Sequence, residues 1–303
     1  MTKSNNHSWP LLPYVNFKST SYLLHRGIQA IGKLKLNTIY EPHWSNVALW
    51  LTCKGLTTGP ISHKDGVFSV EIDLIIHRVG VITSQGLKKS FPLVSMSVSQ
   101  FTEKLLSCLE QLNIHLTINY MPQEVENPIA FDKDIQEQDY DKQLANKWWN
   151  ILLNSYVVMQ RYHGLFAGYS PPIGLMWGTF DLRDARYNGV SVPTKGINSD
   201  YIRRNAMNEA QVEVGWWPGN ENYPRPAYFS FIHPQPEGLE HVLIKPQKAH
   251  WDSSLGEFIL DYEDLTQSTN PEKDLFDFFQ SSYKASTELA HWPSNLVNNG
   301  RPI

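Results

Sequence analysis

The sequence predicts an α+β fold with mainly antiparallel sheets flanked by helices. Apolar residues recur at helical intervals in three long segments, which are residues 98–112, residues 140–166 and a segment that begins after Asn270-Pro271. Between them, short segments alternate polar and apolar residues, which is the pattern of strands with one buried face. Gly- and Pro-rich turns join these segments, and such short connections favour antiparallel pairing over parallel crossover units.

The expected helices carry recognisable start signals. Ser97 and Gln100 stand at the spacing of a capping box, just before the helix expected over residues 98–112. Asn270-Pro271 combines an N-cap residue with proline at the first helical position. A weaker helix is expected over residues 22–31.

Strands are expected at residues 46–54, 67–77, 81–83, 175–183, 209–215, 227–233 and 257–262. We expect one full-length unit over residues 1–303. The order helix, strands, helix occurs twice, which predicts an internal duplication with halves at 20–126 and 140–292 and a polar boundary at 127–139. The alternative is that an α+β chain shows this order by chance.

Composition bounds the class of protein. The 303 residues are 41% hydrophobic and include 10 Trp, which is enough to bury a sizeable core. The net charge is −4 and Lys and Arg are scattered, so nucleic acid is not expected as a partner. Residues 1–10 lack the features of a signal peptide and no segment is apolar enough to span a bilayer, which predicts a cytoplasmic protein. Cys53 and Cys108 belong to no C-x-x-C pair, and both are expected to be buried.

Common catalytic and cofactor motifs are not found in the sequence. It contains no phosphate-binding loop, no dinucleotide fingerprint, no G-x-S-x-G elbow and no H-E-x-x-H. No spacing of its 11 histidines is typical of zinc. We therefore predict neither a metal nor a cofactor, while catalysis without either stays open.

Three of the expected strands have an unusually polar second face. The first carries Glu71, Asp73 and His77. The second carries Trp177, Thr179, Asp181 and Arg183, and the third carries Glu209, Gln211 and Glu213. An antiparallel sheet normally keeps one face in water, so solvated surface is the alternative to a pocket wall.

The second of these strands has the strongest chemical character. Trp177 would supply an apolar floor, and Arg183 would hold an anionic group of a ligand in a forked manner. Asp181 would orient Arg183 or Arg186, or act as an acid or base if its pKa were raised. A purely structural pair of Asp and Arg is the alternative.

Other candidate residues lie in turns or at strand ends. Glu213 leads into a tight aromatic turn, where Trp217 would cover a ligand or serve as packing. His43 lies in a loop before a strand and is a candidate acid or base, as is His77, although lone histidines are more often structural. Thr58, within Gly55-Leu56-Thr57-Thr58-Gly59-Pro60, would meet a carboxylate or phosphate.

Several segments together resemble a family of mostly bacterial proteins known as a domain of unknown function, number five-nine-nine-six. They are Gly32-Lys33, Gly55-Leu56-Thr57-Thr58, Trp177-Gly178-Thr179-Phe180-Asp181-Leu182, Trp217-Pro218-Gly219 and Gly256-Glu257-Phe258. The resemblance covers nearly the whole chain in the right order. One departure is Ser45, which follows His43-Trp44 where the family usually has a second Trp. The resemblance implies a full-length unit and carries no reaction or catalytic residues.

The leading functional hypothesis is a small-molecule pocket protein, which would act by binding or by acid–base chemistry without a metal. The competing hypothesis is a non-catalytic interaction or dimerisation module with exposed aromatic residues. The exposure of Trp216 and Trp217 separates the two, since a flat patch containing both favours the module.

Overall fold

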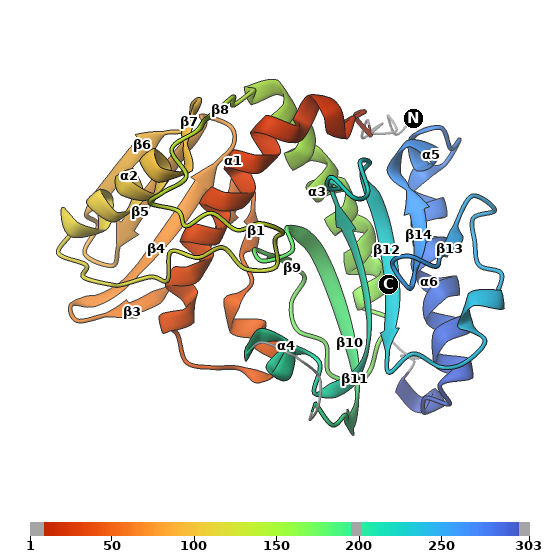
Figure 1. The fold of residues 1–303 in the computed structure, drawn as a ribbon. Helices are drawn as coiled ribbons and strands as arrows, with labels where there is room; N and C mark the ends of the chain where they lie inside the picture. The colour runs from red at the N-terminus through yellow and green to blue at the C-terminus, as the bar shows by residue number, and fades with distance from the viewer. Residues whose placement is uncertain (1–8, 195–200, 297–303) are drawn as a thin grey trace, which may run out of the picture. The chain divides into compact units, whose positions relative to one another are not determined.

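The computed structural model describes residues 9–194 and 201–296 (Figure 1). The helices are α1 (Tyr14–Gly32), α2 (Val98–Glu110), α3 (Lys142–His163), α4 (Tyr201–Ala206), α5 (Tyr262–Thr266) and α6 (Pro271–Leu289), with 3-10 helices η1 (Lys33–Asn37), η2 (Pro42–Val47), η3 (Leu239–His241) and η4 (Ser294–Leu296). The strands are β1 (Trp50–Thr52), β2 (Gly55–Thr57), β3 (Ile61–His63), β4 (Gly66–Asp73), β5 (Arg78–Thr83), β6 (Lys88–Pro92), β7 (Met96–Ser97), β8 (Glu137–Gln138), β9 (Gly174–Met176), β10 (Asp181–Ser191), β11 (Glu209–Trp217), β12 (Ala227–His233), β13 (His250–Asp252) and β14 (Glu257–Asp261).

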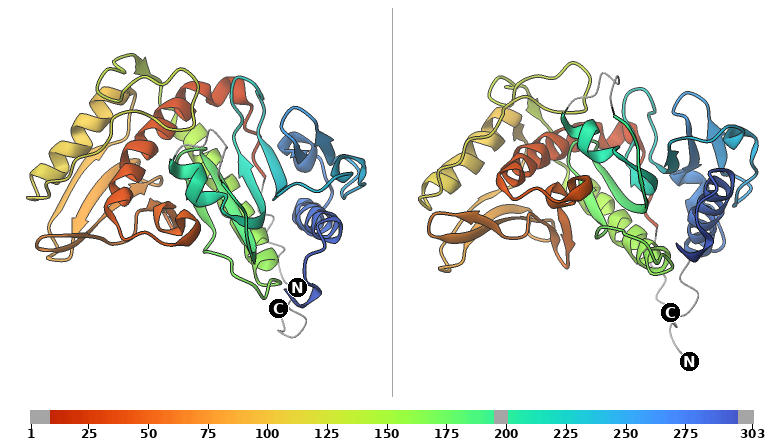
Figure 2. Two further views of the ribbon diagram at one scale, coloured as in Figure 1. Left: turned by 60° about the horizontal axis from the view of Figure 1, so that its bottom comes forward. Right: turned by 90° about the horizontal axis from the view of Figure 1, so that it is seen from below.

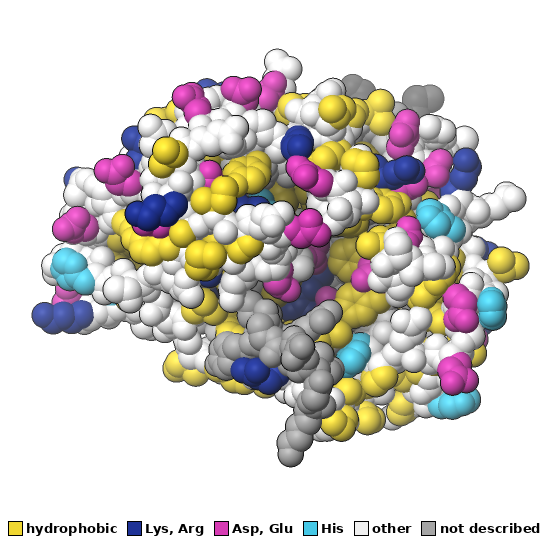
Figure 3. All heavy atoms as spheres, viewed as in Figure 1, with side chains coloured by type: hydrophobic (Ala, Val, Ile, Leu, Met, Phe, Trp, Pro, Cys, Tyr) yellow, Lys and Arg dark blue, Asp and Glu magenta, His cyan; other side chains and the backbone are white. Residues whose placement is uncertain are grey.

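The chain is an α+β protein, as the sequence predicts. The pairs that build its sheets, such as β4 with β5 and β11 with β12, are antiparallel. None of the helices within the described ranges is long and apolar enough to cross a membrane. On the face drawn in Figure 3, acidic and basic side chains are interspersed and neither kind forms a large patch. Most of residues 1–10, on which the predicted cytoplasmic location rests, lie outside the described residues.

The chain divides into two compact units. The N-terminal unit consists of Val15–Trp149 and Gly174–Asp181, and the C-terminal unit of Met1–Tyr14, Asn150–Ile173 and Leu182–Ile303, as far as these are described. Residues 127–139, the expected boundary between halves, lie inside the N-terminal unit. Each unit contains helices before and after its main strands, and the internal duplication stays a prediction.

The N-terminal unit is built on a sheet with strand order β1-β2-β4-β5-β6, and β3 pairs with β4. Along β4, Phe68, Val70 and Ile72 are buried and alternate with more exposed residues, as the period-two pattern predicts. Helices α1 and α2 lie on one side of this sheet (Figure 2). Phe101 of α2 packs edge-on against Phe91 of β6, with ring centroids 5.3 Å apart.

Helix α2 begins where local sequence predicts it, whereas the start of α1 depends on a segment far away in the sequence. The capping box at α2 forms as predicted, because Ser97 Oγ accepts from the Gln100 amide at 3.1 Å and Gln100 Oε1 accepts from the Ser97 amide at 3.0 Å. Helix α1, by contrast, begins well before the predicted residues 22–31. Its first turns contain hydroxyl residues that weaken a sequence signal, but Thr20 Oγ1 donates to the Asp139 carbonyl at 3.1 Å, so a distant segment satisfies one of them.

The C-terminal unit is built on an antiparallel sheet with strand order β13-β14-β12-β11-β10. Helices α3 and α6 cover one face of it. Ser155 of α3 shares a hydrogen bond of 2.7 Å with the Tyr228 hydroxyl of β12, and Phe279 of α6 lies with its ring centroid 6.0 Å from that of Tyr228. Part of the core of this unit therefore lies between the two helices and the face of the sheet that carries Tyr228.

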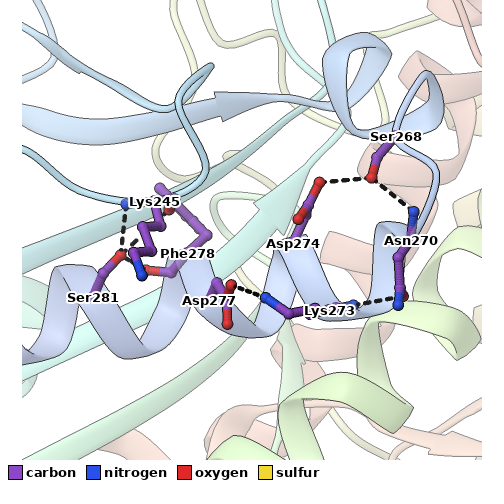
Figure 4. Close-up of polar contacts among 8 residues, drawn as sticks. All are labelled: Lys245, Ser268, Asn270, Lys273, Asp274, Asp277, Phe278 and Ser281. Carbon is purple, nitrogen blue, oxygen red and sulfur yellow. Dashed lines mark hydrogen bonds and ion pairs between the residues drawn. The ribbon is translucent and has the colours of Figure 1, made fainter.

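Helix α6 begins at the predicted N-cap (Figure 4). Asn270 Oδ1 accepts from the Lys273 amide at 3.2 Å, and the Asn270 amide donates to Ser268 Oγ at 3.0 Å. Ser268 Oγ in turn donates to Asp274 Oδ2 at 2.6 Å. Later in the helix, Ser281 Oγ accepts from the Lys245 amide at 2.9 Å and so ties the helix to the preceding loop. Of these contacts, the bond from the Lys273 amide to Asn270 Oδ1 involves the N-cap residue from which the start was predicted.

Three sequence predictions about strands are corrected. Residues 175–183 are not one strand, because a turn separates β9 from β10, and Trp177 and Arg183 therefore do not share a strand face. Strand β4 ends at Asp73, so His77 lies in the following turn with a positive φ of 52°. Cys53 lies in the turn after β1 and is exposed, whereas Cys108 is buried in α2 as predicted.

Candidate functional site

The two faces of the C-terminal sheet have different chemical characters. Because side chains alternate along a strand, odd-numbered residues of β10, β11 and β12 share one face, which we call the odd face. The helices cover the opposite, even face. The odd face carries Arg183, Ala185 and Tyr187 on β10, Gly215, Glu213 and Gln211 on β11, and Phe229 and Phe231 on β12. It therefore places charged and amide side chains next to aromatic rings.

A buried ion pair lies on the odd face. Arg183 is directly opposite Gly215, and its Nη1 reaches diagonally to Glu213 Oε1 at 2.9 Å. The two side chains are only 9% and 11% exposed. Burial raises the pKa of Glu213, and the Arg183 guanidinium opposes that rise. Because both side chains are shielded from water, each charge is stabilised mainly by the opposite charge of its partner.

Gly215 makes room on this face for an aromatic ring. A Cβ atom at this position would lie 2.2 Å from Cζ of Phe229, much closer than van der Waals contact allows. The Phe229 ring can therefore lie against the backbone of β11 in the row next to Glu213. Any side chain at Gly215 would displace the ring beside the ion pair.

Gln211 contributes a buried amide in the next row of the odd face. Its side chain is fully buried, and its Nε2 donates to the Ala206 carbonyl at 2.9 Å and contacts Met207 Sδ at 2.8 Å. Its Oε1 is buried and has no hydrogen-bond partner among the described residues. A buried acceptor without a partner is costly and uncommon, so this oxygen is a candidate contact for a ligand.

Aromatic rings with partial exposure adjoin these polar groups. Phe231 stacks with Phe229 at a centroid distance of 6.3 Å, and Trp217 packs against Tyr223 at 5.5 Å. Trp217, Tyr223 and Phe231 are partly buried around a core cluster that contains Phe229. Figure 3 shows hydrophobic side chains gathered over β11 and β12 with acidic and basic side chains beside them. A ligand on this face would meet flat apolar surfaces and hydrogen-bonding groups together.

Arg186, predicted beside Arg183, lies on the opposite face of β10. It is 1% exposed and its guanidinium lies over the rings of Tyr162 and Tyr283, at 3.4 and 4.4 Å from their centroids. Its Nη2 donates to the Tyr162 carbonyl. Arg186 therefore packs under the helices, and the odd face takes only Arg183 from this predicted pair.

The other predicted residues belong to the N-terminal unit and do not gather in one place. Thr58 is buried, and its hydroxyl donates to the Gly59 carbonyl at 2.7 Å and accepts from the Val70 amide at 3.0 Å. His77 is buried with Nδ1 2.8 Å from the Tyr140 hydroxyl, and burial lowers its pKa. His43 is buried in η2 with a positive φ of 59°. Asp181 is buried and accepts a hydrogen bond from Thr179.

The segment from Trp177 to Phe180 is a turn held by α1. His25 Nε2 and Gln29 Nε2 lie 2.8 and 3.1 Å from the Gly178 carbonyl oxygen. Arg26 Nη1 lies 3.1 Å from His25 Nδ1, and because a guanidinium can only donate, Nδ1 is the unprotonated nitrogen and His25 is neutral. Burial lowers its pKa to about 3. Trp177 lies flat on α1, where a Cβ at Gly32 would fall 2.2 Å from its Cγ. The turn thus has a structural explanation.

Lys33 lies beside the same turn and is nearly completely buried. Its Nζ lies 5.6 Å from the Trp177 ring centroid and 5.9 Å from that of Phe131, and the side chain is 2% exposed. Among the described residues no carboxylate pairs with it. Burial lowers its pKa to about 8. The ammonium is therefore stabilised by aromatic rings rather than by a counter-charge.

Lys33→Met is expected to leave the free energy of unfolding at pH 7 unchanged or to raise it, because no buried partner loses its charge. The lowered pKa means that the folded chain binds fewer protons than the unfolded chain between pH 8 and 10.5, so stability rises with pH in that window. The variant should show a smaller rise. Urea denaturation at pH 7 and pH 10 measures both effects, with Lys35→Met as the control, since Lys35 has a similar pKa but donates to the Ala48 carbonyl at 2.6 Å. A large loss of stability in Lys33→Met at pH 7 would contradict this account.

A comparison with protein families assigns the chain. The model described as "Family of unknown function (DUF5996)" matches residues 9–299. The chain belongs to this family. No curated protein and no solved structure matches the chain. Membership of the family confirms the resemblance seen in the sequence, and the family's description names no activity.

Two polar pairs of the C-terminal unit were not predicted. The pairing of Arg183 with Glu213 depends on the strand register, and no local pattern gives that register. Sequence reasoning also missed His163 and Asp184, which form a hydrogen bond of 2.7 Å. The available signal was the polar Asp184 inside an otherwise buried strand, since such residues need a partner.

Proposed function

We propose that this protein binds a small molecule on the odd face of the C-terminal sheet. The ligand would have a planar apolar body, which lies on Phe229 and Phe231, and a hydrogen-bond donor group such as an amide or amine. The observation that carries this proposal is the buried Gln211 Oε1 without a partner among the described residues, next to the Glu213 carboxylate. A donor group of the ligand would satisfy that oxygen, and the aromatic rings would supply the contact area.

The charges on this face support a neutral or weakly basic ligand. Glu213 is already paired with Arg183, and burial raises its pKa, so it gains from a further donor. An anionic ligand would compete with Glu213 for Arg183. The buried carboxylate of Glu213 would then lose its partner and be repelled by the charge of the ligand. The predicted role of Arg183 as an anion clamp is therefore replaced, in this proposal, by a role in holding Glu213.

The competing interaction-module hypothesis has less support. It required a flat patch that contains both Trp216 and Trp217. Trp216 is fully buried on the even face, with its ring centroid 6.2 Å from that of Tyr262, whereas Trp217 is partly buried on the odd face. Neighbouring residues of a strand point to opposite faces, so the two indoles do not form one patch.

A thermal-shift screen of the purified protein against metabolites tests the proposal. A ligand at a hundred times its dissociation constant adds about 2.7 kcal/mol to the free energy of unfolding, which gives a clear rise in melting temperature. Phe231→Ala should reduce the shift caused by the same ligand at the same concentration. Phe276→Ala, at a partly buried phenylalanine of α6 on which Arg161 stacks at 4.8 Å, is the matched control and should keep the full shift.

Two results would count against the proposal. One is a screen in which no compound raises the melting temperature. The other is a hit whose shift is equally large in wild type and Phe231→Ala, because the ligand would then bind elsewhere. Both variants change a phenylalanine that is not fully buried, so each is expected to fold.

Other properties stay predictions. They are a cytoplasmic location, a homodimer, no binding of nucleic acid, and function without a metal or cofactor. For the last of these, the described ranges contain no group of three or more His, Cys, Asp or Glu residues placed to hold a metal ion.

A further inference from the structure

An aspartate–histidine pair lies on the even face of the C-terminal sheet, away from the proposed ligand site. His163 is the last residue of α3, and its Nδ1 is 2.7 Å from Oδ1 of Asp184 on β10. The Asp184 side chain is 0% exposed, whereas that of His163 is 33% exposed. The carboxylate is therefore completely enclosed while part of the imidazole ring reaches solvent.

Ser170 completes the environment of the pair and fixes the orientation of the ring. Its Oγ donates to the Ala185 carbonyl at 2.6 Å and lies 3.2 Å from both His163 Nδ1 and Asp184 Oδ1. The carboxylate and the hydroxyl thus occupy the same ring nitrogen. This arrangement makes Nδ1 the protonated nitrogen of the neutral ring. It also excludes Ser170 as a nucleophile activated by Nε2, because its hydroxyl is at the other nitrogen.

The second ring nitrogen of His163 is available. His163 Nε2 makes no hydrogen bond to the described residues, and both hydrogen-bond contacts of the ring are at Nδ1. The neutral tautomer set by Asp184 leaves a lone pair on Nε2, and an orienting carboxylate behind the ring increases its basicity. Nε2 is therefore a base that can take a proton from a group arriving from solvent.

The charges that face the ring act in both directions. Asp184 favours the imidazolium through its hydrogen bond and its charge, and the position at the C-terminus of α3 has the same sign of effect. Partial burial and the Arg186 guanidinium on β10 oppose it. The hydrogen bond from Asp184 is the largest influence, and the pKa of His163 is raised.

We propose that His163 and Asp184 form a second functional site, a general-base site at which His163 Nε2 activates water toward a small carbonyl compound such as an ester. Nε2 takes a proton from water as the water oxygen bonds to the carbonyl carbon. The bond from that carbon to the leaving oxygen then breaks, and the electron pair departs with the oxygen. The proton leaves Nε2 for the leaving group or solvent, so that ester and water become acid and alcohol. Asp184 is a positioning residue that holds the tautomer.

Hydrolysis of 4-nitrophenyl acetate by the full chain tests this proposal. His163→Gln should lower the rate due to the protein by at least about tenfold, since a positioned general base contributes about 10²–10⁴-fold. His241→Gln is the matched control: it is an exposed histidine 3.5 Å from a carboxylate oxygen of Glu240, and its loss should leave the rate unchanged. A His163→Gln chain that hydrolyses the ester as fast as the control would overturn the proposal.

The pH dependence separates a catalytic role from a structural one. The wild-type rate should rise with pH to a plateau whose midpoint equals the pKa of His163 measured by NMR. Asp184→Asn should move both midpoints to lower pH, because the favourable hydrogen bond to the imidazolium is lost. An unchanged midpoint in Asp184→Asn, or a wild-type rate midpoint that differs from the NMR value, would contradict the proposal. If Asp184→Asn does not fold, the wild-type comparison of the two midpoints still decides.

Chemical modification provides an independent check in the wild-type chain. Diethyl pyrocarbonate acylates unprotonated imidazole, and peptide mass analysis locates the modified histidine. Modification at His163 should abolish ester hydrolysis in proportion to its extent. Full activity after complete modification of His163 would contradict the proposal. Failure of this site leaves the ligand proposal for the odd face untouched, since the two lie on opposite faces of β10 and the variants do not overlap.

Discussion

Arg183→Ala is expected to lower the free energy of unfolding by about 3–5 kcal/mol, the typical cost of removing one partner of a buried ion pair. The loss arises because Glu213 would keep its charge, or take up a proton, in a site where its side chain is only 11% exposed. Chemical denaturation of the two chains at pH 7 measures the difference. In the wild-type chain, the Glu213 charge is stabilised by Nη1 of Arg183, which lies 2.9 Å from Glu213 Oε1.

A double-mutant cycle identifies the source of this loss. Glu213→Gln removes the charge but keeps the shape, and the double variant Arg183→Ala with Glu213→Gln should be more stable than Arg183→Ala alone. If the three variants are additive, the pair contributes no coupling and the burial of the charges is not what matters. Trp217→Phe, a change on the same face at a ring that packs against Tyr223, serves as the control.

The pH dependence of the same variant gives a second test. A carboxyl group whose folded pKa is raised contributes stability that is present below its unfolded pKa and is lost as pH rises through the folded pKa. Without Arg183 the pKa of Glu213 should rise further, because burial acts unopposed. The deficit of Arg183→Ala should therefore shrink as pH falls toward 4.5, the ordinary pKa of glutamate. A deficit that is constant with pH would mean that Glu213 does not titrate.

This expected loss also decides how ligand binding should be tested. A variant at Arg183 that unfolds easily would lose ligand binding for reasons unrelated to contact. The partly buried Phe231 is a better position, because it can be truncated without an unpaired charge. The ion pair and the aromatic rings thus separate into a group that holds the face and a group that would touch the ligand.

Local sequence signals predicted the elements that depend on neighbouring residues. The capping box at Ser97 and the N-cap at Asn270 satisfy amides within three residues, so the sequence contains all that is needed. Period-two alternation likewise placed Gln211 and Glu213 on one face of a strand. It did not tell whether that face is buried, since the alternation is the same for a wet and a covered face.

Residues that meet across long separations were not predictable in the same way. The alternating polarity from Trp177 to Phe180 predicts part of a strand. The segment is a turn because α1, far away in the sequence, holds the Gly178 carbonyl through His25 and Gln29. The pairing of His163 with Asp184 was also not predictable, because the two residues belong to different elements. The length of α3 and the register of β10 bring them together.

Phe180→Ala is expected to lower the free energy of unfolding by about 3–5 kcal/mol, as for other buried phenylalanines that are truncated to alanine. Phe180 is 2% exposed, and its ring lies between two others. The His25 ring is stacked on one side at a centroid distance of 4.8 Å and the Trp148 ring on the other at 5.2 Å. The truncation would leave a cavity between α1 and α3 that rigid neighbours fill only in part. Chemical denaturation measures the loss, and Phe180→Leu, which keeps most of the volume, should lose much less.

Phe180→Gly separates the side chain from the backbone at this position. The residue has a φ of 66°, in the left-handed region that costs a residue with a Cβ about 1 kcal/mol relative to glycine. Glycine and alanine both remove the ring, so their difference reports only the backbone. We expect Phe180→Gly to be more stable than Phe180→Ala by about 1 kcal/mol, even though it removes one more carbon atom. The opposite order would show that the turn changes conformation once the ring is lost. In that case the stack of His25, Phe180 and Trp148, rather than the hydrogen bonds to Gly178, would be what imposes the turn.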